Sequence, residues 1–145
     1  MGIGMSIRRL LGDSQNIYRI MTYNVEWGFL KLPKGVNKDS CGHPIPQTSE
    51  AQKEHLLLIS KNIGLINPDI CFLQEMGSLD AVKDISNNLS ILFNLNYSNY
   101  YSNTSTGYQG IGLLIKSNLI PLCEVNNIPN FLLRVLLTLI PPPPP

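Results

Sequence analysis

Two polar residues follow short apolar runs, and this is where a sheet can present chemistry to a ligand. Glu75 comes after the run at residues 70–73, and Asn24 comes after the run at residues 20–23. Runs of this length are typical of strands buried on both faces. Open sheets bind their ligands just outside the ends of such strands. A carboxylate and an amide at that edge indicate a ligand site; the plain alternative is a solvated glutamate in an ordinary loop.

Other residues of chemical interest are sparse. Cys41 and His43 share a loop, but two soft ligands do not make a zinc site, which takes four. His55 falls in a predicted helix and is interpreted as a solvated or partly buried residue, not as a catalyst. The three cysteines, which also include Cys71 and Cys123, form no CxxC pair. The pattern favours neither a disulfide framework nor a metal site, and it favours a reducing, intracellular compartment such as the cytoplasm.

Length and composition describe a globular chain. Its 145 residues are one domain's worth, 43% are hydrophobic, 14% are charged, and the net charge is +1. This balance shows neither a basic nucleic-acid footprint nor an acidic tail, so charge selects no partner. No apolar run approaches the length of a membrane span, and no stable membrane insertion is expected. The start of the chain loosely fits N-myristoylation at Gly2; we favour a flexible leader over residues 1–16.

Periodicity places the elements that must position Asn24 and Glu75. Ser49 and Gln52 form a capping-box pattern, which predicts a helix from Ser49 to about Ile63. Ser78 predicts the start of a second helix, because apolar residues then recur at helical spacing. Further strands are expected after the second helix, so the pattern predicts a mixed sheet with helices on one face. The predicted strands and apolar segments are residues 17–25, 70–73, 97–101, 111–115, 119–125 and 131–140.

Three stretches together resemble a known family. "TYNVEWG" at residues 22–28, "NPDICFLQEM" at 67–76 and "GYQGIGLLIK" at 107–116 are similar, in order, to the opening landmarks of the endonuclease/exonuclease/phosphatase superfamily. That group includes DNase-I-like nucleases, abasic-site endonucleases, sphingomyelinases, inositol-polyphosphate phosphatases and deadenylases. Asn24 and Glu75 match the family's strand-ending Asn and its metal-binding Glu.

The resemblance implies an α+β fold. The expected architecture is part of the four-layer α/β sandwich of DNase-I-like proteins, and this chain would supply the N-terminal half: a mixed sheet with flanking helices. The domain is expected over residues 17–140, followed by a polyproline tail at 141–145, which would adopt an extended polyproline II conformation.

The resemblance also implies a function. Family members are Mg²⁺-dependent phosphoesterases, and the substrate would be a nucleic acid, a phospholipid or an inositol phosphate. Glu75 would bind Mg²⁺, a hard ion that prefers oxygen ligands. Asn24 would lie beside the metal or the phosphate, so both residues are assigned catalytic and metal-binding roles.

Half of the family's site has no match in this sequence. The family places an Asp-x-Asn pair and an Asp-His pair further along, yet no Asp follows Asp84 and both histidines precede it. The chain is therefore expected to be truncated and inactive alone, with weak or no Mg²⁺ binding, unless a missing C-terminal half or a partner chain completes the site. The alternative is a non-catalytic binding module or a non-functional gene remnant.

Overall fold

A single mixed sheet organises the part of the chain that the structure describes. The structure is a computed structural model, and it describes residues 3–8, 17–38, 42–103 and 109–122. Within these ranges the sheet has five strands in the order β1-β2-β3-β5-β4. The elements are β1 (Ile3–Arg8), β2 (Ile17–Gly28), α1 (Ser49–Ile66), β3 (Ile70–Met76), α2 (Leu79–Phe93), β4 (Tyr97–Asn103), β5 (Gly110–Lys116) and the 3₁₀ helix η1 (Ser117–Leu122).

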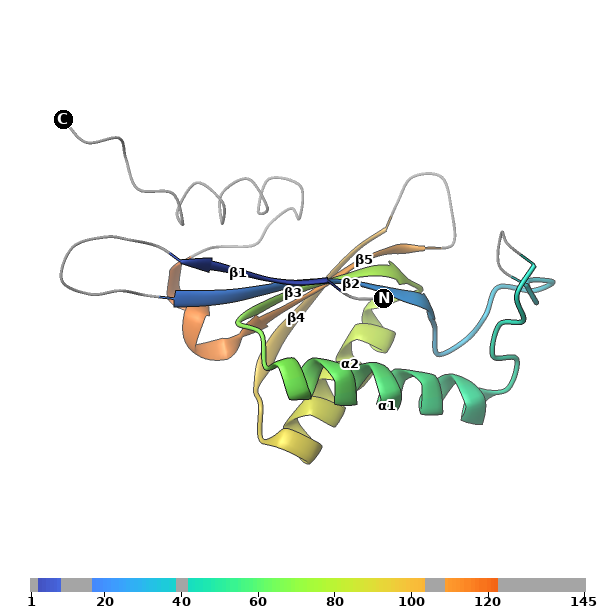
Figure 1. Cartoon of the computed structure of the whole chain (residues 1–145). Coiled ribbons are helices and arrows are strands. Elements are labelled where there is room, and N and C mark those ends of the chain that lie inside the picture. The colour runs from blue at the N-terminus through green and yellow to red at the C-terminus, as the bar shows by residue number, and fades with distance from the viewer. Residues whose placement is uncertain (1–2, 9–16, 39–41, 104–108, 123–145) are drawn as a thin grey trace, which may run out of the picture.

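The strand β3 lies at the centre of the sheet and joins its two halves. It pairs in parallel with β2 and antiparallel with β5. The parallel pair is connected by a crossover through α1, as parallel neighbours require. Both helices lie on the same face of the sheet (Figure 1). The predicted α+β class, with a mixed sheet and flanking helices, is confirmed for the described residues.

The N-terminal strand corrects one expectation. The prediction of a flexible leader over residues 1–16 is wrong for residues 3–8, which form β1 and pair antiparallel with β2, with Ile3 opposite Thr22. Ile3, Met5 and Ile7 alternate with Gly, Ser and Arg, and this period of two is the ordinary signal of a strand. The segment is short, and chain termini are often poorly ordered, so its alternation alone did not predict a strand. Residues 9–16 lie outside the described ranges.

The far end of the chain is only partly described. The predicted apolar segment at residues 119–125 begins instead as the 3₁₀ helix η1, Ser117–Leu122. Leu119 packs, partly buried, against the face of the sheet opposite α1 and α2. The expectations for residues 131–140 and for the proline tail at 141–145 fall outside the described residues and stay predictions.

Helix ends follow capping chemistry, with one correction. The N-cap of α1 is Thr48, one residue before the predicted Ser49: the Ala51 N–H donates to Thr48 Oγ1 at 3.1 Å. Ser78 caps α2 as predicted, with its Oγ 3.2 Å from the Ala81 nitrogen. Helix α1 continues past Gly64, where the Phe93 ring of α2 packs so closely that a Cβ would lie 2.3 Å from it.

This cap assignment predicts different outcomes for two neighbouring residues. We expect Thr48→Ala to lower the free energy of unfolding by about 1 kcal/mol, because the Ala51 N–H loses its acceptor. The matched control Ser49→Ala should change it by less than about 0.5 kcal/mol, as exposed substitutions usually do. Urea denaturation of the parent and the two variants measures both changes in unfolding free energy. A larger loss for Ser49→Ala than for Thr48→Ala would show that Ser49 is the N-cap.

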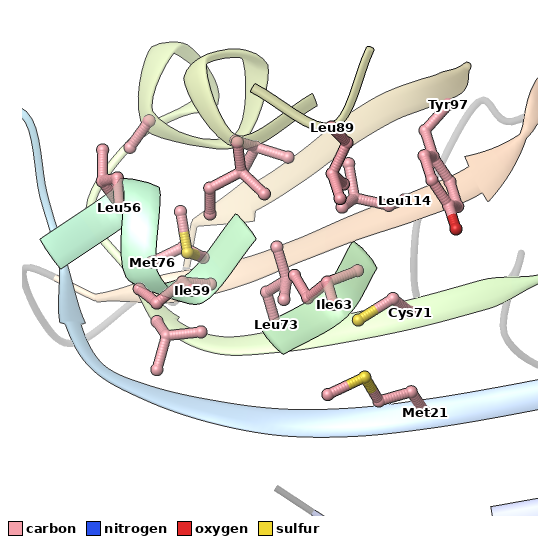
Figure 2. Packing of buried hydrophobic residues seen from close by; sticks show 14 residues of the cluster. Met21, Leu56, Ile59, Ile63, Cys71, Leu73, Met76, Leu89, Tyr97 and Leu114 are labelled. Carbon is pink, nitrogen blue, oxygen red and sulfur yellow. The ribbon is translucent and has the colours of Figure 1, made fainter. Parts of the chain in front are cut away.

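Most of the core lies between the sheet and the helices. Figure 2 shows Leu56, Ile59 and Ile63 of α1 facing Met21, Cys71 and Leu73 of the sheet. Alternation sends the other side chains of each strand to the face opposite α1 and α2. There a smaller apolar cluster forms, made of Ile20, Ile70, Leu113 and Ile115.

Cys71 behaves as the small core residue that the sequence predicts. Its thiol is buried and unpaired, and burial raises its pKa. A buried thiol with a raised pKa is a weak nucleophile.

No helix in the described ranges is both long and apolar enough to cross a membrane.

Candidate functional site

Asn24 and Glu75 meet at the ends of two neighbouring strands. Asn24 Nδ2 donates a hydrogen bond to Glu75 Oε1 at 2.9 Å. The Glu26 N–H donates to Asn24 Oδ1 at 3.0 Å. Because a backbone N–H can only donate, it fixes which end of the Asn24 amide is oxygen, and the NH₂ group must face Glu75. The sequence-based expectation that these two side chains lie together is met by this geometry.

A β-bulge turns Glu75 toward Asn24. Strict alternation would place Glu75 on the helix face, beside Leu73. Instead the register between β3 and β5 shifts, so Gln74 pairs with Ile111 and Met76 with Gly110 while Glu75 is the extra residue. Met76 therefore takes the place on the helix face, where it is fully buried. The Glu75 carboxylate accepts a hydrogen bond from Asn24 Nδ2 instead of packing beside Leu73.

The strand β2 bends at the same level. Between Asn24 and Gly28 its register with β3 shifts, and Glu26 and Trp27 adopt positive φ values of 51° and 68°. Glu75 also has a positive φ, 63°. Left-handed backbone in non-glycine residues costs on the order of 1–3 kcal/mol each and persists only where the surroundings hold it. Three such residues at one edge of the sheet mark this edge as strained.

Hydrogen bonds from both sides hold this strained edge in place. The Gly77 N–H donates to the Gly28 carbonyl at 2.9 Å, which ties the exit of β3 to the exit of β2. From β4, the Tyr101 hydroxyl donates to the Gly77 carbonyl at 3.2 Å, and burial raises its pKa. Close packing adds to these bonds, because a Cβ on Gly110 would lie 2.4 Å from the Ser102 carbonyl oxygen.

Gln109 is a third member of the site that the sequence reasoning missed. Its Nε2 donates to Glu75 Oε2 at 3.3 Å, so each carboxylate oxygen of Glu75 accepts one side-chain amide. Gln109 stands just before β5, which pairs with β3. The signal was available in "GYQGIG", where a polar residue precedes the apolar strand. Gln109 lies near Glu75 because β5 pairs with β3, and a local sequence pattern does not predict which strands pair.

The opposite end of β3 is fixed by an acidic residue with a structural role. The Asp69 carboxylate accepts from the Arg19 backbone N–H at 2.7 Å and from Lys116 Nζ at 2.9 Å. Arg19 belongs to β2 and Lys116 to β5. Asp69 thus clamps three strands together at their shared end and stands away from the site. The register that brings Asn24, Glu75 and Gln109 together is set partly by this clamp.

The remaining candidate ligands do not join the site. His55 lies in α1, half-buried, and its Nε2 is 2.8 Å from the Val25 carbonyl oxygen and 3.1 Å from that of Glu26. It is partly buried, as predicted. His43 is exposed in the loop before α1, and Cys41 lies outside the described residues. In the described ranges no group of three or more His, Cys, Asp or Glu residues could hold a metal ion.

The donor set suits a hard cation only in part. Glu75 offers one carboxylate, half-buried, and Mg²⁺ is often held by one or two carboxylates with water completing its octahedron. The Asn24 oxygen already accepts from the Glu26 N–H. To serve as a metal ligand it would need to share or leave that bond. Glu75 therefore fits a cation better than Asn24 does.

Comparisons with solved structures find a likeness over part of the chain. The described residues form an α+β structure with a polar site at the strand ends. Solved structures of TDP2 from Caenorhabditis elegans are similar to it. One is 19% identical with a TM-score of 0.37, and it covers 68% of this chain and 22% of that one. A selenomethionine form is 17% identical with a TM-score of 0.38, covering 79% and 23%.

A truncated form of the same protein is 21% identical, with a TM-score of 0.36. This chain spans between 22% and 29% of the length of these structures. No family model matches the sequence, and no curated protein matches it.

Proposed function

We propose that this chain is part of a Mg²⁺-dependent phosphoesterase domain, with Glu75 as a metal-binding carboxylate. The observation that carries the proposal is the contact between Asn24 and Glu75 at the exits of two parallel strands. It joins the two residues that the resemblance to the endonuclease/exonuclease/phosphatase superfamily assigns to the site. The resemblance implies a substrate that is a nucleic acid, a phospholipid or an inositol phosphate, and it does not select among them. An intracellular setting remains a prediction.

The chain's own residues supply positioning in this proposal. The amides of Asn24 and Gln109 hold the two oxygens of Glu75, which fixes the carboxylate plane at the strand ends. A bound Mg²⁺ would add positive charge for a phosphate oxygen and would lower the pKa of a bound water. Asn24 has a second N–H that could donate to a phosphate oxygen, as side-chain amides have two donors.

The chain is proposed to need further residues for hydrolysis. Phosphoester hydrolysis in this family uses an acid or base, and a histidine is the usual choice. Here His55 hydrogen-bonds the backbone of β2, and no Asp follows Asp84. We therefore expect the chain by itself not to cleave phosphodiesters. A continuation of the chain or a partner would have to supply the missing groups.

A non-catalytic binding module is the alternative, and one observation favours it. Both oxygens of Glu75 are satisfied by side-chain amides of the same chain. A partly buried carboxylate with two donors is stable without a cation, since hydrogen bonds to its charged form offset the loss of water. On this alternative Glu75 would hold the three strand ends together and bind no metal.

Paramagnetic broadening separates these two functions. We expect Mn²⁺ to broaden the side-chain amide signals of Asn24 and Gln109 in ¹H–¹⁵N spectra, with affinity in the millimolar range of sites having few charged ligands. Glu75→Gln should remove this selective broadening, because it removes the charge and keeps the shape. The matched control Asp80→Asn changes an exposed carboxylate on α2 and should leave it intact.

Two results would count against the phosphoesterase proposal. Equal broadening of the Asn24 signals in the parent and in Glu75→Gln would place the ion elsewhere. Absence of broadening at any Mn²⁺ concentration that the fold tolerates would favour the binding module. Hydrolysis of DNA, RNA or a phospholipid by this chain alone, lost in Glu75→Gln, would support the metal site but overturn the expectation of inactivity.

A further inference from the structure

A continuous chain of hydrogen bonds runs from α1 through the bend of β2 to Glu75. His55 Nε2 lies 2.8 Å from the Val25 carbonyl oxygen and 3.1 Å from the Glu26 carbonyl oxygen. Both neighbours are acceptors, so Nε2 must carry the proton. His55 is therefore a donor at this contact, whether its ring is neutral or charged.

The next two links use amide groups pointing the same way. The Val25 carbonyl and the Glu26 N–H belong to one peptide unit. That N–H donates to Asn24 Oδ1 at 3.0 Å, and Asn24 Nδ2 donates to Glu75 Oε1 at 2.9 Å. Each amide accepts on its oxygen and donates from its nitrogen, and hydrogen bonds aligned in this way polarise and strengthen one another. The chain of donors ends on a carboxylate, the strongest acceptor available.

The position of His55 also explains how the bent part of β2 is held. Glu26 and Trp27 have left-handed backbone, and their segment departs from the ladder with β3 between Asn24 and Gly28. Two carbonyls of this segment receive the one N–H of His55. The contact comes from α1, and hydrogen bonds link His55 to Glu75 through the Val25–Glu26 peptide and the Asn24 side chain.

We propose that His55 is a positioning residue for Glu75, acting through the Val25–Glu26 peptide and the Asn24 amide. Its importance for metal binding rests on the proposed function; the positioning itself does not. The competing explanation is that His55 only packs α1 onto the sheet. That explanation predicts a change in stability and no selective change at Asn24 or Glu26.

The experiment compares three variants by ¹H–¹⁵N NMR and hydrogen exchange. His55→Phe keeps a ring without a donor, and His55→Gln offers an amide donor in its place. Asn62→Ala is the matched control, because Asn62 also lies in α1 and bonds a β2 side chain, Tyr23, at 2.9 Å. The readouts are the Asn24 side-chain amide signals, the exchange rate of the Glu26 N–H and the ¹⁵N shifts of the His55 ring in the parent.

We expect His55→Phe to raise the exchange rate of the Glu26 N–H roughly tenfold, as loss of one supporting hydrogen bond would, and to shift the Asn24 side-chain signals. His55→Gln should restore both toward the parent, and Asn62→Ala should change neither. In the parent, the ring of His55 should carry its proton on Nε2. If the ring of the parent is protonated on Nδ1 alone, the proposal is wrong whether or not any variant folds.

Unchanged Glu26 exchange and Asn24 signals in a folded His55→Phe variant would likewise overturn the positioning role. Mn²⁺ titration of the same samples separates this outcome from failure of the proposed function. If the NMR changes occur but the parent binds no Mn²⁺ at Glu75, positioning stands and the metal site fails. If both hold, Mn²⁺ affinity in His55→Phe should drop about tenfold, as for other residues that orient a metal ligand.

Discussion

Leu73→Ala should lower the free energy of unfolding by about 2–5 kcal/mol, the range for removing a large aliphatic side chain from a packed core. Leu73 is fully buried in the central strand, and it packs in the cluster shared by the sheet and both helices (Figure 2). Small domains have about 5–15 kcal/mol in total, so this single change would remove a large part of the stability.

Leu65→Ala provides the matched control for this prediction. Leu65 is the same residue type but is 78% exposed on α1, and its truncation should change the unfolding free energy by less than about 0.5 kcal/mol. Urea denaturation followed by circular dichroism gives both values. Similar losses for the two variants would contradict the burial of Leu73 between the sheet and the helices.

Stability should also fall steeply in alkaline solution. Burial raises the pKa of the Cys71 thiol. Burial also raises the pKa of Tyr97, with further increases from the negative charges of Cys71 and Asp69 and an opposing effect of Arg19. Both groups hold their protons more tightly in the folded than in the unfolded state. Their contribution is complete below the unfolded pKa values, about 8.5 for Cys and 10 for Tyr, and is lost as pH rises above them.

The slope of stability against pH measures this effect. Above pH ~10 each group should remove about 1.4 kcal/mol per pH unit until its folded-state pKa is reached. We expect Tyr97→Phe and Cys71→Ala each to flatten the slope between pH 8.5 and 11 in urea denaturation series, and the double variant to flatten it most. At neutral pH Tyr97→Phe should cost about 1 kcal/mol, because its hydroxyl donates to the Pro68 carbonyl at 2.6 Å. An unchanged slope in the double variant would contradict the prediction.

Local signals in the sequence were enough to locate most of the fold. The helical spacing after Ser78 and the apolar run at residues 70–73 correspond to α2 and β3. These elements are long or strongly patterned, so the local apolar pattern was enough to predict them without knowledge of their tertiary contacts. The strand Ile3–Arg8 was missed because its six residues gave a short pattern at a chain end.

The site was predictable in its residues but not in its construction. Asn24 and Glu75 could be named because polar residues at strand exits stand out in the sequence. The bulge could not, since left-handed backbone is a glycine preference and Glu75 gives no such signal. Gln109 and His55 join through pairings between distant segments. A local sequence pattern predicts contacts between residues that are close in the chain, and it does not predict these long-range contacts.

The central place of β3 has a consequence for the order in which the protein folds. β1 with β2, and β4 with β5, are neighbours in the chain and form antiparallel pairs between segments close in sequence. β3 must find one strand of each pair, and its bonds to Asn24 and Gln109 join residues 51 and 34 positions apart. Closing longer loops costs more entropy, and non-local pairings form slowly. We therefore expect the carboxylate of Glu75 to meet its partners only when the two halves dock, and partly folded chains not to display the site.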